Sequence, residues 1–171
     1  MSLWGRIFAA GYDTFQASIE RNFMGRIRDD LLAQASGSVI EIGAGTGVNL
    51  SHYPPSVTRL VCTEPEEPMA RRLRRKADEL GRDVEIVEAP AESLPFADDA
   101  FDTAVATLVL CTVSDPAKAL REIARVLRPG GRLIFIEHVR SPEPRLNPAA
   151  PRYCAKPVIS PTAADAPNVD L

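Results

Sequence analysis

The sequence predicts an α/β protein with a Rossmann-like, doubly wound sheet of five parallel strands. Three observations support this prediction. Short apolar runs alternate with amphipathic segments between residues 37 and 140, and a glycine cluster follows the first run. Alternating strands and helices favour parallel strands with right-handed crossovers. The third observation is size: 171 residues with 45% hydrophobic content can bury the core of one domain.

Five apolar, partly β-branched runs predict the strands, at residues 38–42, 59–63, 84–87, 101–107 and 132–138. After the second run, Met69, Leu73, Ala77 and Leu80 predict one apolar helix face, closed by Gly81. The sequence 114–116 (Ser-Asp-Pro) has the form of a helix start, and 128–131 (Arg-Pro-Gly-Gly) ends that helix.

The regions on either side of residues 37–140 differ from this core. Residues 1–36 carry apolar side chains at helical spacing and predict an amphipathic helical lid over the ligand site. In residues 141–171, seven of thirty-one residues are proline and the apolar residues form no periodic pattern. We therefore expect a proline-rich, extended or disordered tail.

Composition excludes several classes of function. The net charge of −3 disfavours nucleic acid as a partner, because phosphate binding needs a basic excess. The three cysteines are far apart and form no CxxC pair, which predicts no metal site and a cytoplasmic protein. The N-terminal apolar patch around Leu3 and Trp4 is too short for a membrane span. It leaves open peripheral membrane contact or packing over the site, and we favour packing.

The glycine cluster Gly43, Gly45 and Gly47 lies where an open parallel sheet binds its ligand, after the first strand. Dinucleotide sites use G-x-G-x-x-G, whereas the third glycine here comes two positions after the second. Glu41 precedes the cluster and suits a cationic amine better than a pyrophosphate. Glu64 ends the second strand, where it either binds both ribose hydroxyls or caps the next helix.

These motifs together resemble the class I S-adenosylmethionine-dependent methyltransferases, in the small-molecule branch similar to thiol methyltransferases. The matching residues are Glu41 to Gly47, Glu64-Pro65, Ala91 to Phe96 and Leu127 to Gly131. The resemblance implies S-adenosyl-L-methionine as cofactor, S-adenosyl-L-homocysteine as product, and a small-molecule thiol, hydroxyl or amine as acceptor. It also implies a C-terminal helix and antiparallel strand pair, which the tail is predicted to lack. The exposed fifth strand could then pair two copies of the chain.

By the same resemblance, eleven residues form the cofactor site: Glu41, Gly43, Ala44, Gly45, Gly47, Glu64, Pro65, Met69, Ala91, Glu92 and Thr107. Candidates for catalysis are His138 as a base, Glu137 as the group that orients it, and Tyr12 over the cofactor. For His138 and Tyr12, ordinary structural roles are equally compatible with the sequence. Two other functions remain open: a truncated S-adenosylmethionine-binding module without turnover, and a nucleotide-cofactor oxidoreductase.

Overall fold

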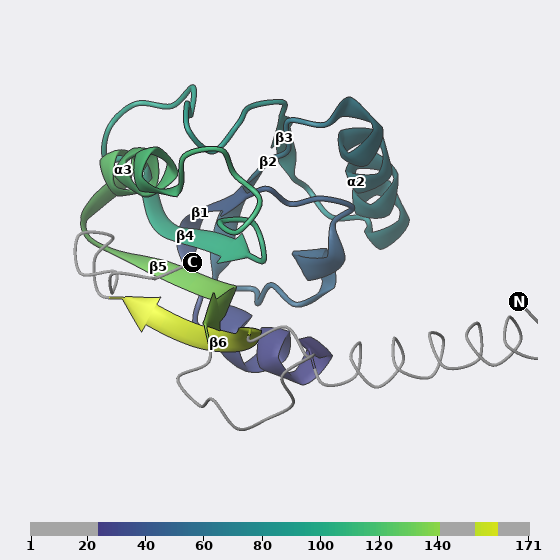
Figure 1. Cartoon of the computed structure of the whole chain (residues 1–171). Helices are drawn as coiled ribbons and strands as arrows, with labels where there is room; N and C mark the ends of the chain where they lie inside the picture. The colour runs from purple at the N-terminus through teal and green to yellow at the C-terminus, as the bar shows by residue number, and fades with distance from the viewer. Residues whose placement is uncertain (1–23, 141–152, 161–171) are drawn as a thin grey trace, which may run out of the picture.

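A computed structural model of the chain describes residues 24–140 and the backbone of residues 153–160. The sheet has six strands in the order β3-β2-β1-β4-β5-β6 (Figure 1). The expected five parallel strands are β1 (Gly37–Ile42), β2 (Val57–Thr63), β3 (Glu85–Val87), β4 (Phe101–Thr107) and β5 (Leu127–Arg140). The doubly wound α/β prediction is therefore confirmed.

Helices cover both faces of the sheet. One face packs against helical residues 24–32 and α2 (Glu67–Leu80) through a cluster that includes Leu32, Val39, Leu73 and Ala77. The other face packs against α3 (Pro116–Val126) through Phe101, Ala119, Ile123 and other apolar residues. Figure 1 shows α2 and α3 on opposite sides of the central strands.

The helix boundaries follow the predicted capping residues. Gly81 ends α2 in the left-handed conformation, with φ at 59°. Asp115 caps α3 by accepting a hydrogen bond from the Lys118 N–H. The predicted face of α2 needs one correction, because Met69 and Leu80 are exposed and Ala70 is buried in their place. A small residue allows α2 to approach the sheet closely, and this leaves Met69 beside the ligand cavity.

The tail prediction also needs correction. Residues Tyr153–Ser160 form β6, which pairs antiparallel with β5, so one antiparallel strand is present. Pro157 lies opposite Ile136 in this pair. An edge strand tolerates a proline because one side of its backbone has no neighbour. The edge of β5 is consequently covered by β6, so β5 does not offer the exposed edge that the sequence led us to expect, and pairing of two chains stays untested.

Two further points concern the segment after the glycine cluster and the N-terminal residues. The glycine cluster leads into η1 (Val48–Ser51), a single turn of 3-10 helix. Tyr12 and the patch around Leu3 and Trp4 lie outside the described residues. Among the helices of the described part, none is long and apolar enough to cross a bilayer.

Candidate functional site

The glycine turn joins β1 to η1 at the carboxyl end of the sheet. Gly43 and Gly45 have φ of 60° and 58°, in the region that favours glycine. The Ala44 N–H donates to the Thr63 carbonyl of β2 at 2.9 Å, which fixes the turn against the neighbouring strand. A Cβ on Gly43 would lie 2.2 Å from Cγ2 of Val109. Only glycine therefore allows the loop after β4 to pack this closely on the turn.

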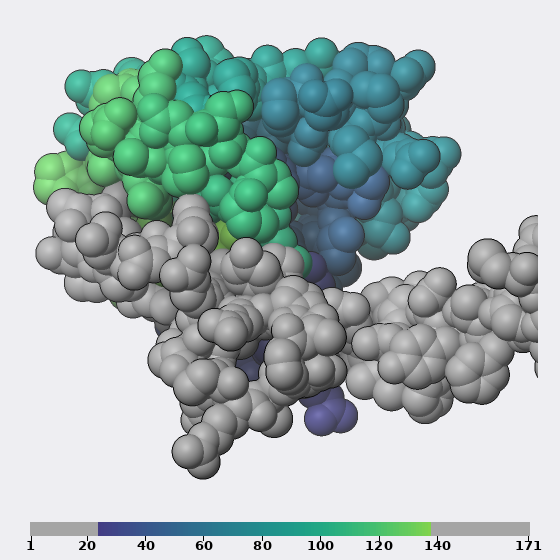
Figure 2. Space-filling view, in the orientation of Figure 1, coloured from purple at the N-terminus to yellow at the C-terminus, as the bar shows by residue number. Residues whose placement is uncertain are grey.

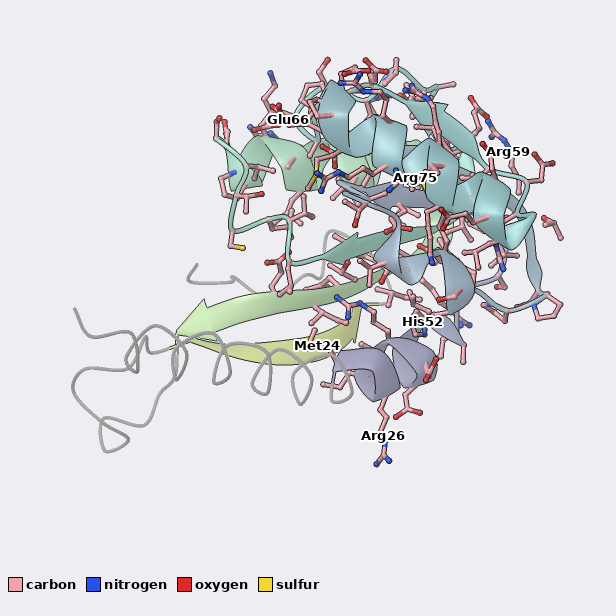
Figure 3. All side chains as sticks on the ribbon, turned by 90° about the vertical axis from the view of Figure 1, so that its right-hand side faces the viewer. Met24, Arg26, His52, Arg59, Glu66 and Arg75 are labelled. Atoms are coloured by element: carbon pink, nitrogen blue, oxygen red, sulfur yellow. The ribbon has the colours of Figure 1, made fainter. Side chains whose placement is uncertain are left out.

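Glu64 connects the turn to α2. Its Oε2 accepts a hydrogen bond from the Gly45 N–H at 2.8 Å, and its Oε1 accepts one from the Glu66 N–H at 3.0 Å. Glu66 is the N-cap residue of α2 and lies at the end of that helix (Figure 3). Glu64 thus holds the glycine turn and the residue that precedes α2, while its ribose role stays a prediction. Each carboxylate oxygen retains acceptor capacity for a ligand hydroxyl.

Glu41 is a buried carboxyl group at the floor of the site. Its two oxygens accept hydrogen bonds from Asn49 Nδ2 at 2.9 Å and from the Tyr53 hydroxyl at 2.7 Å. Burial raises the pKa of Glu41 to about 7, and these hydrogen bonds and the nearby Arg28 limit the rise. The carboxyl group therefore changes charge near neutral pH.

These elements surround a cavity of about 680 Å³, which is within the usual range for a small-molecule or cofactor site. In Figure 2, the green residues of the α3 half and the blue residues of the α2 half face each other, with darker residues from nearer the N-terminus recessed between them. Four groups line the cavity: the glycine turn with the end of β1 and η1, the start of α2, the loops after β3 and β4, and Arg28 of helical residues 24–32.

The cavity brings together all but one of the predicted cofactor residues. Its lining includes Glu41, Gly43, Ala44, Gly45, Glu64, Pro65, Met69, Ala91, Glu92 and Thr107. Gly47 is not part of the lining. A Cβ on Gly47 would lie 2.8 Å from Leu73 Cδ1, so this glycine serves packing between η1 and α2.

The loops on the α3 side of the cavity are held by charged side chains. Glu92 Oε1 accepts hydrogen bonds from the backbone N–H groups of Ser114 and Asp115, at 2.9 and 3.3 Å. Arg125 of α3 donates to the carbonyls of Leu94 and Phe96 at 2.9 and 2.8 Å. Both interactions fix the segment that presents Ala91 to the cavity.

Of the three catalytic candidates, only Glu137 has a side chain that the structure describes. Glu137 is fully buried in β5 and is not part of the cavity lining; its Oε1 accepts hydrogen bonds from the N–H groups of Val109 and Leu110, both at 2.8 Å. His138 lies in β5 opposite Ala155, and its side chain is outside the described part. Tyr12 is also outside it. Glu137 therefore contacts the loop after β4, and its catalytic role stays a prediction.

Arg28 and Asn49 also line the cavity, and neither was predicted as a site residue. Asn49 donates to Glu41 and to Thr107 Oγ1, the latter at 3.0 Å, and is only 2% exposed. A polar residue inside the first turn after the glycines was a usable signal for Asn49. Nothing in the sequence distinguished Arg28 from Arg26 on the same helical segment. Only the packing of that segment buries part of Arg28 and leaves Arg26 exposed.

No group of three or more histidine, cysteine or acidic side chains in the described ranges could hold a metal ion. The cavity is rich in carboxylates instead. Glu41, Glu64, Glu66 and Glu92 all line it, and this charge suits a cationic ligand.

Comparison with known proteins identifies the family. Residues 40–135 match the family described as a methyltransferase domain. The human thiol S-methyltransferase TMT1B is 44% identical over 117 residues, which is 65% of this chain and 47% of that protein. The chain thus spans about half the length of the curated relatives it matches.

Solved structures agree. The YcgJ protein from Bacillus subtilis superposes with a TM-score of 0.63 at 32% identity, covering 70% of this chain and 52% of that one. A SAM-dependent methyltransferase from Thermotoga maritima, named as a possible histamine N-methyltransferase, has a TM-score of 0.56 at 29% identity. That match covers 75% of this chain and 57% of the other. The chain belongs to the methyltransferase domain family, and S-adenosylmethionine is its cofactor.

Proposed function

We propose that this protein transfers the methyl group of S-adenosylmethionine to a small-molecule acceptor, and that the acceptor group is a thiol. The observation that supports this most directly is the 680 Å³ cavity at the glycine turn. Its lining combines a turn open to close backbone approach, several carboxylates and the exposed Met69.

The lining fits the cofactor chemically. S-adenosylmethionine carries a sulfonium and an ammonium, and carboxylates such as Glu41 stabilise positive charge near them. Met69, which is 39% exposed, offers an apolar contact to the adenine.

The acceptor side of the cavity is the loop after β4. Leu108 has an unusual φ of 56°, and its N–H donates to the Ile136 carbonyl at 2.7 Å. Glu137 holds the next two N–H groups, so the backbone of this loop is fixed where it lines the cavity. A fixed wall of this kind can orient an acceptor, and proximity alone supplies much of the acceleration of methyl transfer.

The reaction balances without a metal. When bound, the cofactor would supply an electrophilic methyl group. A bond would form between the acceptor sulfur and the methyl carbon as the sulfonium C–S bond broke, and S-adenosylhomocysteine would be the leaving group. The thiol proton leaves to solvent before transfer, because a thiol with pKa of about 8.5 already supplies some thiolate at neutral pH. The human relative TMT1B is a thiol S-methyltransferase, which supports a thiol here as well.

Two measurements test the proposal. Isothermal titration calorimetry with S-adenosylmethionine and with NAD should show binding of the first only. Glu64→Gln should weaken S-adenosylmethionine binding at least tenfold, since it removes a charged acceptor near the ribose, whereas the exposed Arg72→Gln should bind as the wild type does. Tighter binding of NAD would instead favour an oxidoreductase.

Transfer is tested with labelled S-adenosylmethionine and a panel of alkyl thiols, phenols, amines and quinones. We expect methylation of thiols, at a rate that rises with pH up to the pKa of the thiol. Transfer to another acceptor group would correct the acceptor class. Cofactor binding without transfer to any of them would support the non-turnover alternative and contradict the proposed activity.

A further inference from the structure

The loop after β4 directs its hydrogen-bond donors into the protein rather than into the cavity. The Leu108 N–H donates to the Ile136 carbonyl at 2.7 Å, and the Val109 N–H donates to Glu137 Oε1 at 2.8 Å. The N–H and the hydroxyl of Thr112 both donate to the Val109 carbonyl, at 2.9 and 2.7 Å. Leu108, Val109 and Thr112 all line the cavity. An acceptor that reaches this wall therefore finds these donors already bonded.

The side chains that the same wall presents are hydrocarbon. Leu108, Val109 and Val113 are half-buried and line the cavity. Val48 of η1 lines it too and is 53% exposed. A Cβ on Gly43 would lie 2.2 Å from Val109 Cγ2, so the wall lies directly beside the glycine turn. Apolar side chains left partly exposed in a concave site are suited to the apolar part of a ligand.

The charges around the cavity disfavour an anionic acceptor. The carboxylates of the lining are Glu41, Glu64, Glu66 and Glu92, and Arg28 is the only cation among its described residues. S-adenosylmethionine would add one net positive charge, so the carboxylates would still outnumber the cations. A carboxylate or phosphate on the acceptor would be repelled by this excess and would lose its hydration against the apolar wall.

We propose that the acceptor is an uncharged thiol whose hydrocarbon part packs against Val109 and Val113, and that thiols carrying a carboxylate or a phosphate are excluded. The inference rests on the proposed function, since it assumes that S-adenosylmethionine occupies the cavity and that a thiol is methylated. A thiol suits a wall without free polar groups, because a fraction of it ionises at neutral pH without a bonded base, whereas an alcohol needs that base.

The first test compares two thiols of nearly the same shape. In 3-methylbutane-1-thiol, two methyl groups take the place of the carboxylate oxygens of 3-mercaptopropionate. Methyl transfer from labelled S-adenosylmethionine is measured for both thiols at one pH, and their kcat/KM values are compared. We expect the uncharged thiol to be favoured at least tenfold. An equal or higher value for the anionic thiol would overturn the inference and leave the proposed function intact, because a thiol would still be methylated.

The second test separates charge from shape with Glu66→Gln. Glu66 is exposed at the start of α2 and lines the cavity (Figure 3). Glu67→Gln is the matched control, because Glu67 pairs with Arg71 at 2.8 Å and is not part of the lining. We expect Glu66→Gln to narrow the preference for the uncharged thiol at least threefold and Glu67→Gln to leave it unchanged. Equal preferences in the two variants would overturn selection by the charge of the cavity.

The third test changes the wall itself. Val113→Thr keeps the shape of the side chain but adds a hydroxyl, and Val57→Thr is the control at the opposite end of the sheet, outside the cavity lining. We expect Val113→Thr to lower kcat/KM for 3-methylbutane-1-thiol at least threefold, with calorimetric affinity for S-adenosylmethionine unchanged. Acceptor kinetics like those of the control would overturn packing on this wall. A wild-type protein that binds S-adenosylmethionine but methylates no thiol would overturn the proposed function, and the inference with it.

Discussion

The Tyr53 hydroxyl donates a 2.7 Å hydrogen bond to the carboxylate of Glu41 in the interior of the protein. Tyr53 and Glu41 are only 4% and 1% exposed, so the pair is shielded from solvent. Burial still dominates, and it raises the pKa of Glu41 from 4.5 to about 7. Because this pKa differs from that of the unfolded chain, the protonation of Glu41 makes the free energy of unfolding depend on pH.

The first prediction concerns stability against pH. Because the pKa of Glu41 is higher in the folded state, the folded protein binds more protons than the unfolded chain between pH 4.5 and about 7. The favourable contribution of the protonated group is complete below pH 4.5 and is lost as pH rises through 7. Glu41→Gln cannot ionise. As the pH rises from 4.5 to above 7, wild type should lose stability that the variant keeps. The free energy of unfolding of the variant minus that of wild type should therefore increase with pH, by about 3 kcal/mol at most.

Urea unfolding of both proteins at several pH values between 5 and 8 measures this difference. Taking the difference at each pH cancels the contributions of other carboxyl groups, such as Glu122, whose pKa is lowered to about 2 mainly by its hydrogen bonds to Arg125. A variant-to-wild-type difference that stays constant with pH would show that Glu41 does not titrate in this way.

The second prediction compares two glycines of the turn. Alanine at either position meets the left-handed strain of about 1 kcal/mol. Gly43→Ala also drives a methyl into Val109, whereas Gly45→Ala places it in open space at the cavity. Gly43→Ala should therefore lower the melting temperature clearly more than Gly45→Ala. Gly45→Ala should lower cofactor affinity at least tenfold, and its melting temperature should fall only by the few degrees that this strain causes.

Thermal melts and calorimetric titrations of the two variants separate these effects. Equal melting temperatures would mean that Val109 moves aside without cost. Unchanged cofactor affinity in Gly45→Ala would mean that the cofactor does not approach the backbone at this residue.

The third prediction concerns Arg125, whose guanidinium joins α3 to the segment after β3. Besides two carbonyls it donates to Asp98 and Glu122, each at 2.8 Å. Arg125→Lys keeps the charge but cannot make these bonds together, because an ammonium lacks the planar fork. We expect a loss of about 1–3 kcal/mol in unfolding free energy. Cofactor affinity should also fall, since Ala91 lies on this segment.

Arg121→Lys, at an exposed position of the same helix, is the control for the third prediction and should leave both quantities unchanged. If Arg125→Lys melts like the control, the segment is held by its apolar contacts alone.

The sequence predicted the parts of the site that depend on local chemistry. Glycines at 43 and 45 and an acid at 64 mark a strand end and a ligand turn, and the structure places all three in the cavity. Arg28 depends on tertiary packing, because burial of one arginine in a helix and exposure of another follow from how the helix docks. The strand β6 was missed because Pro157 suggests no sheet, while pairing with β5 is a long-range event.

The final prediction concerns Glu137 as a positioning residue. Its carboxylate accepts from the N–H groups of Val109 and Leu110, and Val109 packs directly on Gly43. Glu137→Ala leaves two N–H groups without their partner, so the loop after β4 should shift at both the acceptor wall and the glycine turn. We expect at least a tenfold loss in cofactor affinity and a higher acceptor KM.

Glu137→Gln should restore both values to within threefold of wild type, because the amide oxygen can still accept the two hydrogen bonds. Calorimetry and steady-state kinetics on the two variants provide the comparison. A general base would behave differently: Glu137→Gln would lose kcat as severely as Glu137→Ala, with the cofactor affinity unchanged, since an amide cannot take up a proton at neutral pH. That result would move Glu137 from positioning the loop to the chemistry itself.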